Sequence, residues 1–430
     1  MKKLTILLTF SFLYAQFNYS GESIVQTMNR ISDKSDINLP YRAMSLNLGY
    51  TLGAIDINTV SAIEYRNNTS KSSFNLREAY LAYYPDWGEI KLGKQIHAWG
   101  AADGNNPTDN LNPYDYYYLF KIGEGRKIGV ISLSSKIYFG NSHLEGVIIP
   151  KYEKNRFPYG EKDFPLSVLE EPTITYPVRN EFEFGLRVQT TILESDIGLS
   201  LFRGNDRAPS MRAANITYEV ETGTPQIESL LGYRETFVTG LDFVTFIGDL
   251  TFRGEVALFR SRNPILVLNL FKTPLSLYEF QQDIKYSQYV LQVEYTTSSD
   301  IILSGQLIGN STQDEAYEWY HSSSREYVDF PSPEFQAGMG NPLAMFSEFA
   351  LIFGSTGVLM DDRLELKGNI MVNLDEKGSM ISTSFGYSPL INWKLQTSIT
   401  KFIGDENNPE NTFTKMEDFS NINLSLIYNF

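Results

Sequence analysis

The last ten residues of the chain, 421–430, alternate between apolar and polar side chains. The apolar positions are Ile422, Leu424, Leu426, Tyr428 and Phe430, and the positions between them are mostly Asn and Ser. Because successive side chains of a strand point to opposite faces, a period of two predicts a β-strand with one apolar and one polar face. Such a strand suits a sheet with water on one side and an apolar medium on the other.

The same alternation recurs along the chain in runs of about ten residues that are bounded by turn residues. We predict eighteen strands, with sixteen as the alternative. The first half of the chain supplies segments 18–29, 42–52, 54–66, 74–84, 87–98, 125–134, 136–149, 179–192 and 195–204. The second half supplies segments 234–247, 249–261, 284–297, 300–309, 344–355, 362–374, 379–388, 391–402 and 420–430. Segment 212–221 also alternates, and we assign it to a hairpin within the connection 205–233.

Short and long connections alternate between these segments. The predicted tight joints lie at Gly53, Pro85 with Asp86, Ser135, Leu193 with Glu194, Gly248, Ser298 with Ser299, and Pro389 with Leu390. Transmembrane β-barrels have short periplasmic turns and long external loops, and an even strand number places both chain ends on the periplasmic side. The pattern therefore predicts an all-β fold, namely a single closed antiparallel transmembrane β-barrel.

The polar face of the clearest strands carries charges of both signs. The residues that we expect to line the lumen are Glu181, Glu183, Arg187, Arg253, Glu255, Arg363, Glu365 and Lys367. A Lys or Arg on the lipid-facing wall would cost about 2 to 4 kcal/mol at mid-depth, so this sorting of charge is informative. Two interpretations stay open: a charged constriction that selects solutes, or salt bridges that hold a narrow barrel together. Lys94 is an exception, because it falls on the outward face and requires a bulge or a site near the interface.

The beginning of the chain has the pattern of a secretory signal peptide. Lys2 and Lys3 precede an apolar run, 4–13, and Ala15 supplies a small residue for cleavage. This divides the chain into a signal peptide, 1–15, and a barrel, 16–430. No later stretch approaches the roughly 20 consecutive apolar residues of a membrane helix.

Composition supports this assignment and excludes several kinds of chemistry. Aromatic residues make up 14% of the chain, as expected for a barrel with aromatic girdles at both interfaces. The absence of Cys suits an oxidising compartment and excludes disulfides and thiolate metal sites. A net charge of -15 argues against a nucleic-acid partner. His97, His143 and His321 fall on different segments without catalytic or metal-ligand spacing, so we expect no enzyme activity, metal or cofactor.

A motif in segment 76–116 resembles a known family. The motif residues are Ile90, Lys91, Leu92, Gly93, Lys94 and Gln95, followed by Trp99, Gly100, Ala102, Asp103, Gly104, Asn112, Pro113 and Asp115. They resemble the hairpin and loop of uncharacterised porin-like outer-membrane β-barrels related to the alginate-export type, with Ile90 as a conservative departure from Leu. The resemblance implies a bacterial outer-membrane barrel that passes or exports solutes. It does not imply alginate, because a polyuronate calls for a strongly basic lumen. The terminal Phe430 likewise resembles the signal that the barrel-assembly machinery reads.

The long loop 99–124 is expected to fold into the barrel and narrow it, as long loops do in many porins. Its candidate constriction residues are Trp99, Asp103, Asp109, Asn112 and Asp115. A calcium site at Asp103, Asn105, Asp109 and Asn110 is the alternative, but the spacing lacks the pattern of a calcium loop, and ordinary turn chemistry explains these residue types. The apolar segment 265–271 is expected to pack against the inner rim rather than to bind an apolar substrate or lipopolysaccharide.

These features predict an outer-membrane channel for diffusion or facilitated transport of small polar solutes, embedded in outer-membrane lipid. One alternative is a transporter for hydrophobic substrates, although such a transporter would carry an apolar plug and residues 16–41 are mostly polar. Another alternative is a structural or adhesive barrel with a closed lumen, whose long loops (150–178, 205–233 and 310–343) bind partners.

Overall fold

The computed structural model describes residues 15–69, 71–121, 123–165, 170–219, 221–265, 276–345 and 347–430. The predicted signal peptide, apart from Ala15, and most of segment 265–271 lie outside the described residues. Across the described part of the chain, no helix is long and apolar enough to span a membrane.

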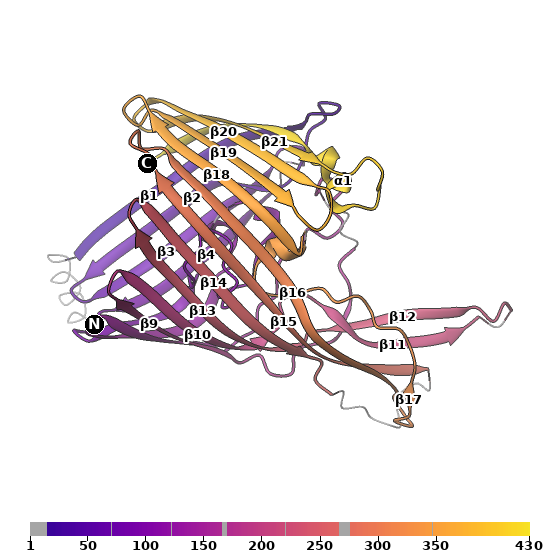
Figure 1. Cartoon of the computed structure of the whole chain (residues 1–430). Coiled ribbons are helices and arrows are strands. Elements are labelled where there is room, and N and C mark those ends of the chain that lie inside the picture. The colour runs from indigo at the N-terminus through magenta and orange to yellow at the C-terminus, as the bar shows by residue number, and fades with distance from the viewer. Residues whose placement is uncertain are drawn as a thin grey trace, which may run out of the picture.

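Eighteen antiparallel strands form one closed barrel (Figure 1). The first nine strands are β1 (Ala15–Arg30), β2 (Tyr41–Leu52), β3 (Ile55–Arg66), β4 (Lys71–Tyr83), β5 (Gly88–Gln95), β6 (Val130–Phe139), β7 (Ser142–Ile149), β9 (Glu183–Ile192) and β10 (Ser195–Asn205). The others are β13 (Glu235–Ile247), β14 (Leu250–Arg262), β15 (Leu277–Thr296), β16 (Ile302–His321), β18 (Phe349–Leu359), β19 (Leu364–Asn373), β20 (Ser379–Leu390), β21 (Trp393–Ile403) and β22 (Asn421–Asn429). Pairing of β1 with β22 closes the barrel, so the predicted fold and strand number are confirmed.

The remaining elements lie in the external connections. Four short strands are β8 (Ile174–Tyr176), β11 (Ser210–Tyr218), β12 (Pro225–Gly232) and β17 (Tyr327–Val328). The helical turns are η2 (Tyr116–Tyr118), η3 (Gly123–Arg126), η4 (Pro342–Met345), α1 (Thr412–Met416) and η5 (Glu417–Phe419). β11 and β12 form the hairpin predicted within 205–233, and together with the long ends of β15 and β16 they make an arm that projects from one end of the barrel (Figure 1).

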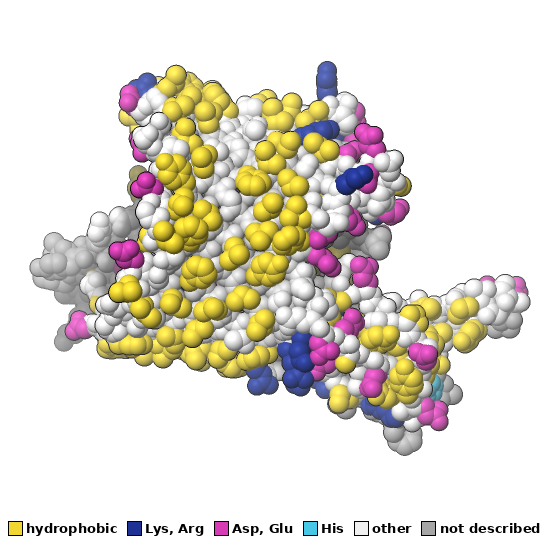
Figure 2. Space-filling view, in the orientation of Figure 1, with side chains coloured by type: hydrophobic (Ala, Val, Ile, Leu, Met, Phe, Trp, Pro, Cys, Tyr) yellow, Lys and Arg dark blue, Asp and Glu magenta, His cyan; other side chains and the backbone are white. Residues whose placement is uncertain are grey.

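Apolar side chains, which we call the apolar belt, cover the outer face of the barrel that Figure 2 shows. In β19, Leu366 and Ile370 are exposed on the outer wall, whereas Met371 and Asn373 are buried on the inner side. Large exposed aromatic residues gather at the end of the barrel that carries the short turns, namely Phe17, Tyr19, Tyr83, Trp87, Tyr138, Phe139, Phe246 and Trp393. An apolar band with an aromatic girdle is the outer surface of a transmembrane β-barrel.

Two of the predicted turns are wrong. The turn between β6 and β7 lies at Gly140 and Asn141 rather than at Ser135, because Gly140 takes a left-handed conformation (φ 59°) while Ser135 continues the extended strand. β20 likewise runs through Leu390, and the chain reverses only before Trp393.

Lys94, on the outward face of β5, finds a hydrogen-bond acceptor beside a bulge in β4. In the pairing of β3 with β4, Arg77 is an extra residue between Leu76 and Glu78. Lys94 Nζ donates a hydrogen bond to the Leu76 carbonyl, next to this bulge, at 2.7 Å. The ammonium group therefore satisfies a backbone acceptor instead of facing lipid.

Candidate functional site

The connection between β5 and β6, which we call the inward loop (residues 96–129), lies inside the barrel along its described residues, 96–121 and 123–129. Its side chains and backbone contact the lumen faces of β14, β15 and β16 through Glu255, Gln292 and Gln306. Gly240 of β13 leaves room for the side chain of Thr108, because a Cβ at Gly240 would lie 2.9 Å from it. The loop that the sequence places at 99–124 is therefore held against the opposite wall.

One carboxylate of β14, that of Glu255, holds the tip of the inward loop. It accepts hydrogen bonds from the backbone N–H of Ala101 (2.6 Å) and Ala102 (2.7 Å), from Asn106 Nδ2 (2.8 Å) and from Thr108 Oγ1 (2.7 Å). Glu255 is only 4% exposed, so the loop covers the carboxylate completely. Its observed contacts are those of a loop anchor.

A second set of contacts fixes Asp103 to β15 and β16. The Asp103 N–H donates to Gln292 Oε1 at 2.9 Å, and Gln292 Nε2 donates to Asp103 Oδ2 at 2.6 Å. Gln306 Nε2 donates to the Asp103 carbonyl at 2.8 Å. The Asp103 side chain is still 54% exposed and lies 3.6 Å from Arg253. This pair therefore presents both signs of charge to water within the lumen.

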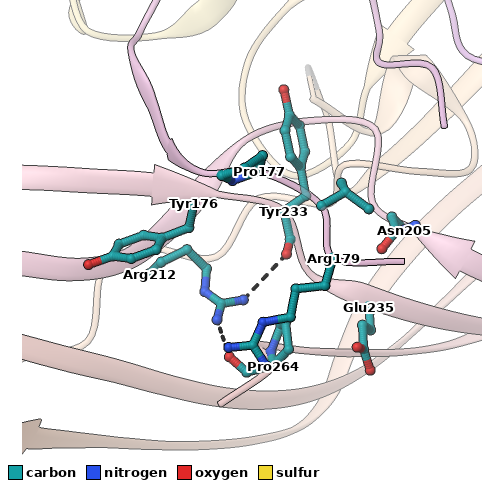
Figure 3. Close-up of a pocket in the computed structure, with 9 residues that line it drawn as sticks. Tyr176, Pro177, Arg179, Asn205, Arg212, Tyr233, Glu235 and Pro264 are labelled. Carbon is teal, nitrogen blue, oxygen red and sulfur yellow. Dashed lines mark hydrogen bonds between the residues drawn. The ribbon is translucent and has the colours of Figure 1, made fainter. Parts of the chain in front are cut away.

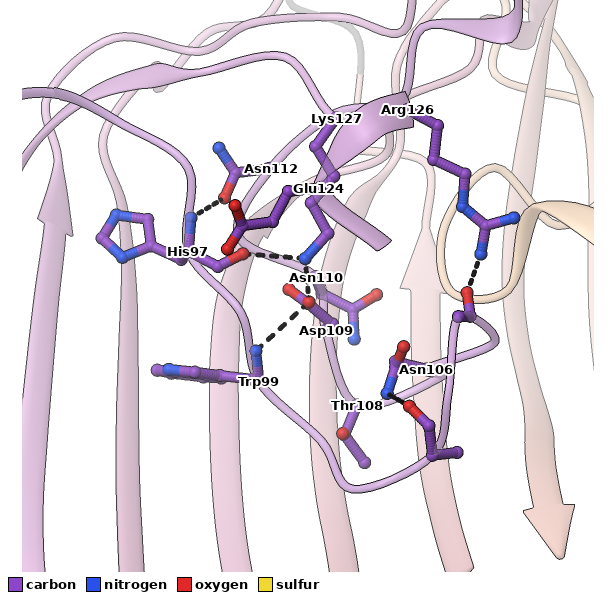
Figure 4. A network of polar contacts seen from close by, with 12 residues as sticks. His97, Trp99, Asn106, Thr108, Asp109, Asn110, Asn112, Glu124, Arg126 and Lys127 are labelled. Atoms are coloured by element: carbon purple, nitrogen blue, oxygen red, sulfur yellow. Dashed lines mark hydrogen bonds and ion pairs between the residues drawn. The ribbon is translucent and has the colours of Figure 1, made fainter. Parts of the chain in front are cut away.

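The base of the inward loop is a network of buried polar contacts (Figure 4). Asn112 Oδ1 accepts from the His97 N–H at 2.7 Å, and Asn112 Nδ2 donates to the carbonyls of Gln95 and Ile128. Lys127 forms an ion pair with Asp109. These contacts tie the two ends of the loop together.

The same network bears on the calcium alternative. Lys127 neutralises Asp109, which also accepts a hydrogen bond from the Trp99 N–H at 3.2 Å. Asp115 accepts from Tyr117 and pairs with Arg156 at 2.9 Å. Over the described residues, no group of three or more His, Cys, Asp or Glu side chains is arranged to hold a metal ion. The carboxylates of Asp109 and Asp115 are therefore engaged by the chain itself.

Two apolar clusters attach the inward loop to opposite parts of the barrel. On one side, Trp99 and Leu111 pack in a cluster that also contains Phe202, Val238, Phe259, Tyr286 and Met339. On the other side, Tyr116 and Leu119 pack in a cluster that also contains Met371, Phe402, Phe413, Met416 and Phe419. The loop therefore crosses the lumen from one wall to the other.

Of the predicted lumen residues, those of β9 form buried ion pairs. Glu183 is fully buried and lies 2.7 Å from Arg207 of the connection after β10. Arg187 makes a two-point contact with Asp242 of β13, at 2.6 and 2.8 Å. Glu181 lies outside the barrel strands, in the exposed connection before β9. The alternation predicts that Glu181, Glu183 and Arg187 share one lumen face. In the structure Glu183 and Arg187 are buried in separate ion pairs, and Glu181 is exposed outside the strand.

The predicted residues of β19, and Arg253 of β14, lie nearer to water. Glu365 pairs with Lys367 and with Lys394 of β21, and all three side chains are partly exposed. Arg253 lies 4.0 Å from Glu294 of β15. Arg363 falls in the turn between β18 and β19 and is exposed.

A charged cavity of about 130 Å³ on the inner wall of β4 to β7 was not among the predicted sites. It is lined by residues that include Glu78, Glu89, Lys91, Lys136 and Glu145. Lys91 lies 2.8 Å from Glu89, and Lys136 lies 3.5 Å from Glu145. The alternation of Glu89 and Lys91 with Ile90 and Leu92 was the sequence signal that could have identified it.

A cavity of about 300 Å³ lies where β8 and the β11–β12 hairpin meet the barrel (Figure 3). Arg212 and Arg179 both line it. Arg212 donates to the carbonyls of Tyr233 and Pro264, and burial lowers the pKa of Arg212 to about 10. The guanidinium therefore keeps its charge at neutral pH.

We expect His97 to make the free energy of unfolding sensitive to acid. Burial, together with the nearby Lys127, lowers the pKa of His97 to about 3. As the pH falls from 6.5 towards 3, the unfolded chain takes up a proton that the folded chain excludes, so folding loses up to about 1.4 kcal/mol for each pH unit. We expect His97→Gln to reduce this loss. Urea unfolding at pH 7 and pH 5 tests it, with His321→Gln as the control, and equal pH dependence of wild type and His97→Gln would contradict it.

Glu255→Ala should release the tip of the inward loop while the barrel stays folded. The substitution leaves the N–H groups of Ala101 and Ala102 without their acceptor, and each buried unsatisfied donor costs about 1 to 3 kcal/mol. Hydrogen exchange at these two amides should accelerate by at least roughly tenfold, whereas exchange in β19 should not change. Slow exchange in the variant would show that the loop is held by other contacts.

Comparison with known proteins supports the fold. No protein-family model and no curated protein sequence matches the chain. The structure of Pseudomonas aeruginosa OccK2 (OpdF) is similar with a TM-score of 0.51, 10% identity and coverage of 97% of each chain. OccK11 (OpdR) from the same organism has a TM-score of 0.50, 10% identity and 96% coverage of each chain. OccK2 in complex with glucuronate has a TM-score of 0.50, 11% identity and 97% coverage of each chain.

At this level of identity the comparisons establish the fold. The chain shares the architecture of these outer-membrane proteins along nearly its whole length. Together with the apolar belt and the aromatic girdle, this architecture indicates a barrel of the bacterial outer membrane.

Proposed function

We propose that the chain is a porin-like channel that lets small polar solutes cross the bacterial outer membrane. The observation that carries the proposal is a closed barrel whose lumen holds an inward loop and solvated charges of both signs. A loop that crosses a barrel narrows the passage, and charged side chains beside it act on passing solutes. The similarity in fold to OccK channels supports the same function.

The solutes proposed are small rather than polymeric. The inward loop touches both walls of the lumen, which leaves little width for a polymer. The neighbouring OccK2 structure contains glucuronate, a small acidic solute, and solutes of that size suit this chain as well. The finer resemblance to alginate-export barrels rests on segment 76–116 alone and stays a prediction. We propose no enzyme activity.

Among the predicted site residues, those with solvated side chains are the proposed pore lining. This set consists of Asp103, Arg253, Glu365 and Lys367, with Glu181 and Arg363 at the two ends of the barrel. Glu183, Arg187 and Glu255 are buried, and we assign them to holding the wall and the inward loop.

Export and assembly complete the proposal. Residues 1–15 serve as a signal peptide, and Phe430 is read by the barrel-assembly machinery. Two features support the second role. Phe430 exchanges backbone hydrogen bonds with Gly21 at 2.9 and 3.0 Å, and its ring stacks near that of Tyr428. The terminal strand therefore stands at the seam where the barrel closes.

A barrel with a closed lumen is the second candidate function. Two apolar clusters seal the inward loop to the walls, and the arm of β11 and β12 extends far beyond the barrel, as a partner-binding element would (Figure 1). This candidate predicts external binding without conduction.

Single-channel recording in planar bilayers decides between the two. We expect stable conducting steps with a cation-to-anion permeability ratio within roughly threefold of one, because solvated charges of both signs line the passage. Strong selectivity for one sign would contradict the mixed lining. Complete absence of steps from a folded barrel would favour the closed structure.

A further inference from the structure

Basic side chains gather on the outer wall at the edge of the apolar belt, where the arm leaves the barrel (Figure 2). They belong to β10, β14 and β15, and we call them the rim cluster (Arg203, Arg260, Arg262 and Lys285). Strand register places them at one level of the wall, with Phe237 of β13 between Arg203 and Arg260. Arg203 is opposite Phe237, Phe237 is opposite Arg260, and Arg260 is opposite Lys285. The row therefore runs across β10, β13, β14 and β15.

The row stands directly above lipid-facing residues. Arg203 follows Leu201 by two positions, and Arg260 follows Leu258 by two, so each charge lies about 7 Å beyond an exposed apolar side chain. The charges point outward, as Leu201 and Leu258 do, and away from the lumen. This is the level at which the headgroups of the outer leaflet meet the barrel.

Carboxylates of the chain satisfy these cations only in part. Arg260 makes a two-point contact with Asp283, Arg262 lies 3.1 Å from Glu235, and Lys285 lies 2.8 Å from Asp314. These pairs are roughly half exposed. Exposed pairs of this kind contribute little to stability, so folding alone does not explain the row.

Arg203 has a different environment. Among the described residues it forms no ion pair, and its cross-strand neighbour on β13 is the ring of Phe237. Every guanidinium carries five N–H donors, so the cluster retains many free donors after its own pairs are counted. Phosphate accepts such donors strongly, and arginine is the side chain best suited to bind it.

We propose that the rim cluster binds the phosphorylated headgroup of an outer-leaflet lipid whose acyl chains lie along Leu201 and Leu258. A free phosphate would meet the same donors but would gain nothing from the apolar wall beneath them. A lipid would therefore contact both the rim cluster and the apolar wall, whereas a free phosphate would contact the rim cluster alone. The binding is direct and is independent of transport through the lumen.

Native mass spectrometry of the detergent-solubilised full chain tests the proposal, with diphosphorylated lipid A as the probe and EDTA present to exclude metal bridges. The test variant is R203Q/R260Q/R262Q/K285Q. The matched control is K151Q/K154Q/K377Q/K415Q, which removes four external lysines that each have a carboxylate partner away from the apolar wall. We expect affinity to fall by about tenfold or more in the test variant and to stay within about twofold of wild type in the control.

Three results would overturn the proposal: equal affinity of the test variant and wild type, equal binding of dephosphorylated lipid, or equal retention of inorganic phosphate without lipid. Heat-dependent mobility on gels verifies that each variant is folded. Should the quadruple variant fail to fold, Arg203→Gln alone carries the test, because it breaks no ion pair. We expect this variant to bind the lipid about threefold more weakly.

Discussion

Removal of the inward loop is expected to raise single-channel conductance roughly three- to tenfold, because an empty barrel of this size leaves a wide aqueous channel. The deletion is feasible at residues 96–129, since Gln95 and Val130 are already paired across β5 and β6 and a short turn can join them. The loop now crosses between two walls and is held by Glu255, so its loss clears the lumen.

A deletion of the external hairpin is the matched control for this experiment. Ala213 and Leu230 are paired in β11 and β12, so the hairpin beyond them can be closed by a turn in the same way. We expect no change in conductance, because this hairpin lies outside the lumen. Equal conductance of the loop deletion and wild type would show that the inward loop does not limit the passage.

Loss of the Glu183 carboxylate is expected to lower the free energy of unfolding by about 3 to 5 kcal/mol, because it leaves a buried cation without its partner. Glu183→Ala removes the carboxylate that lies 2.7 Å from Arg207, and both side chains are almost completely buried. It also removes the acceptor for the Asn205 N–H. Urea unfolding in lipid vesicles measures the change.

The exposed pair of Lys415 and Glu410 provides the comparison for Glu183. Glu410→Ala breaks a contact of 2.7 Å between exposed side chains and should cost less than about 1 kcal/mol. The double substitution of Glu183 and Arg207 by Met should recover part of the loss, since no charge is then left buried. A small effect of Glu183→Ala would contradict the assignment of this pair to wall stability.

The fold could be predicted because one physical rule governs every strand. A wall between lipid and water imposes a period of two, and Leu366, Ile370 and Leu424 all fall on the outer face that their spacing predicts. The predicted position of the turn between β6 and β7 was wrong, because Ser134 and Ser135 are residues that also occur in turns and they come earlier in the chain. The turn forms instead at Gly140 with Asn141, a dipeptide that the sequence displays plainly.

The candidate site was less predictable, because period two identifies a face but not what covers it. Glu255 faces the lumen as its spacing indicates, yet the backbone of residues 101–108 buries it from the far side of the barrel. Glu183 is buried through Arg207, which lies in a different connection. Such contacts depend on how a long loop folds back into the barrel. The alternation of apolar and polar residues within a strand does not predict the path of such a loop.

Modification of single cysteines tests the central claim most directly, because the chain contains no cysteine of its own. Lys367→Cys and Leu366→Cys place neighbouring thiols on the two faces of β19, one towards the lumen and one towards lipid. During single-channel recording, a charged water-soluble methanethiosulfonate reagent should change the conductance of Lys367→Cys and leave that of Leu366→Cys unaltered. The same response from both positions, or modification of Leu366→Cys alone, would contradict a water-filled barrel whose charged face lines the passage.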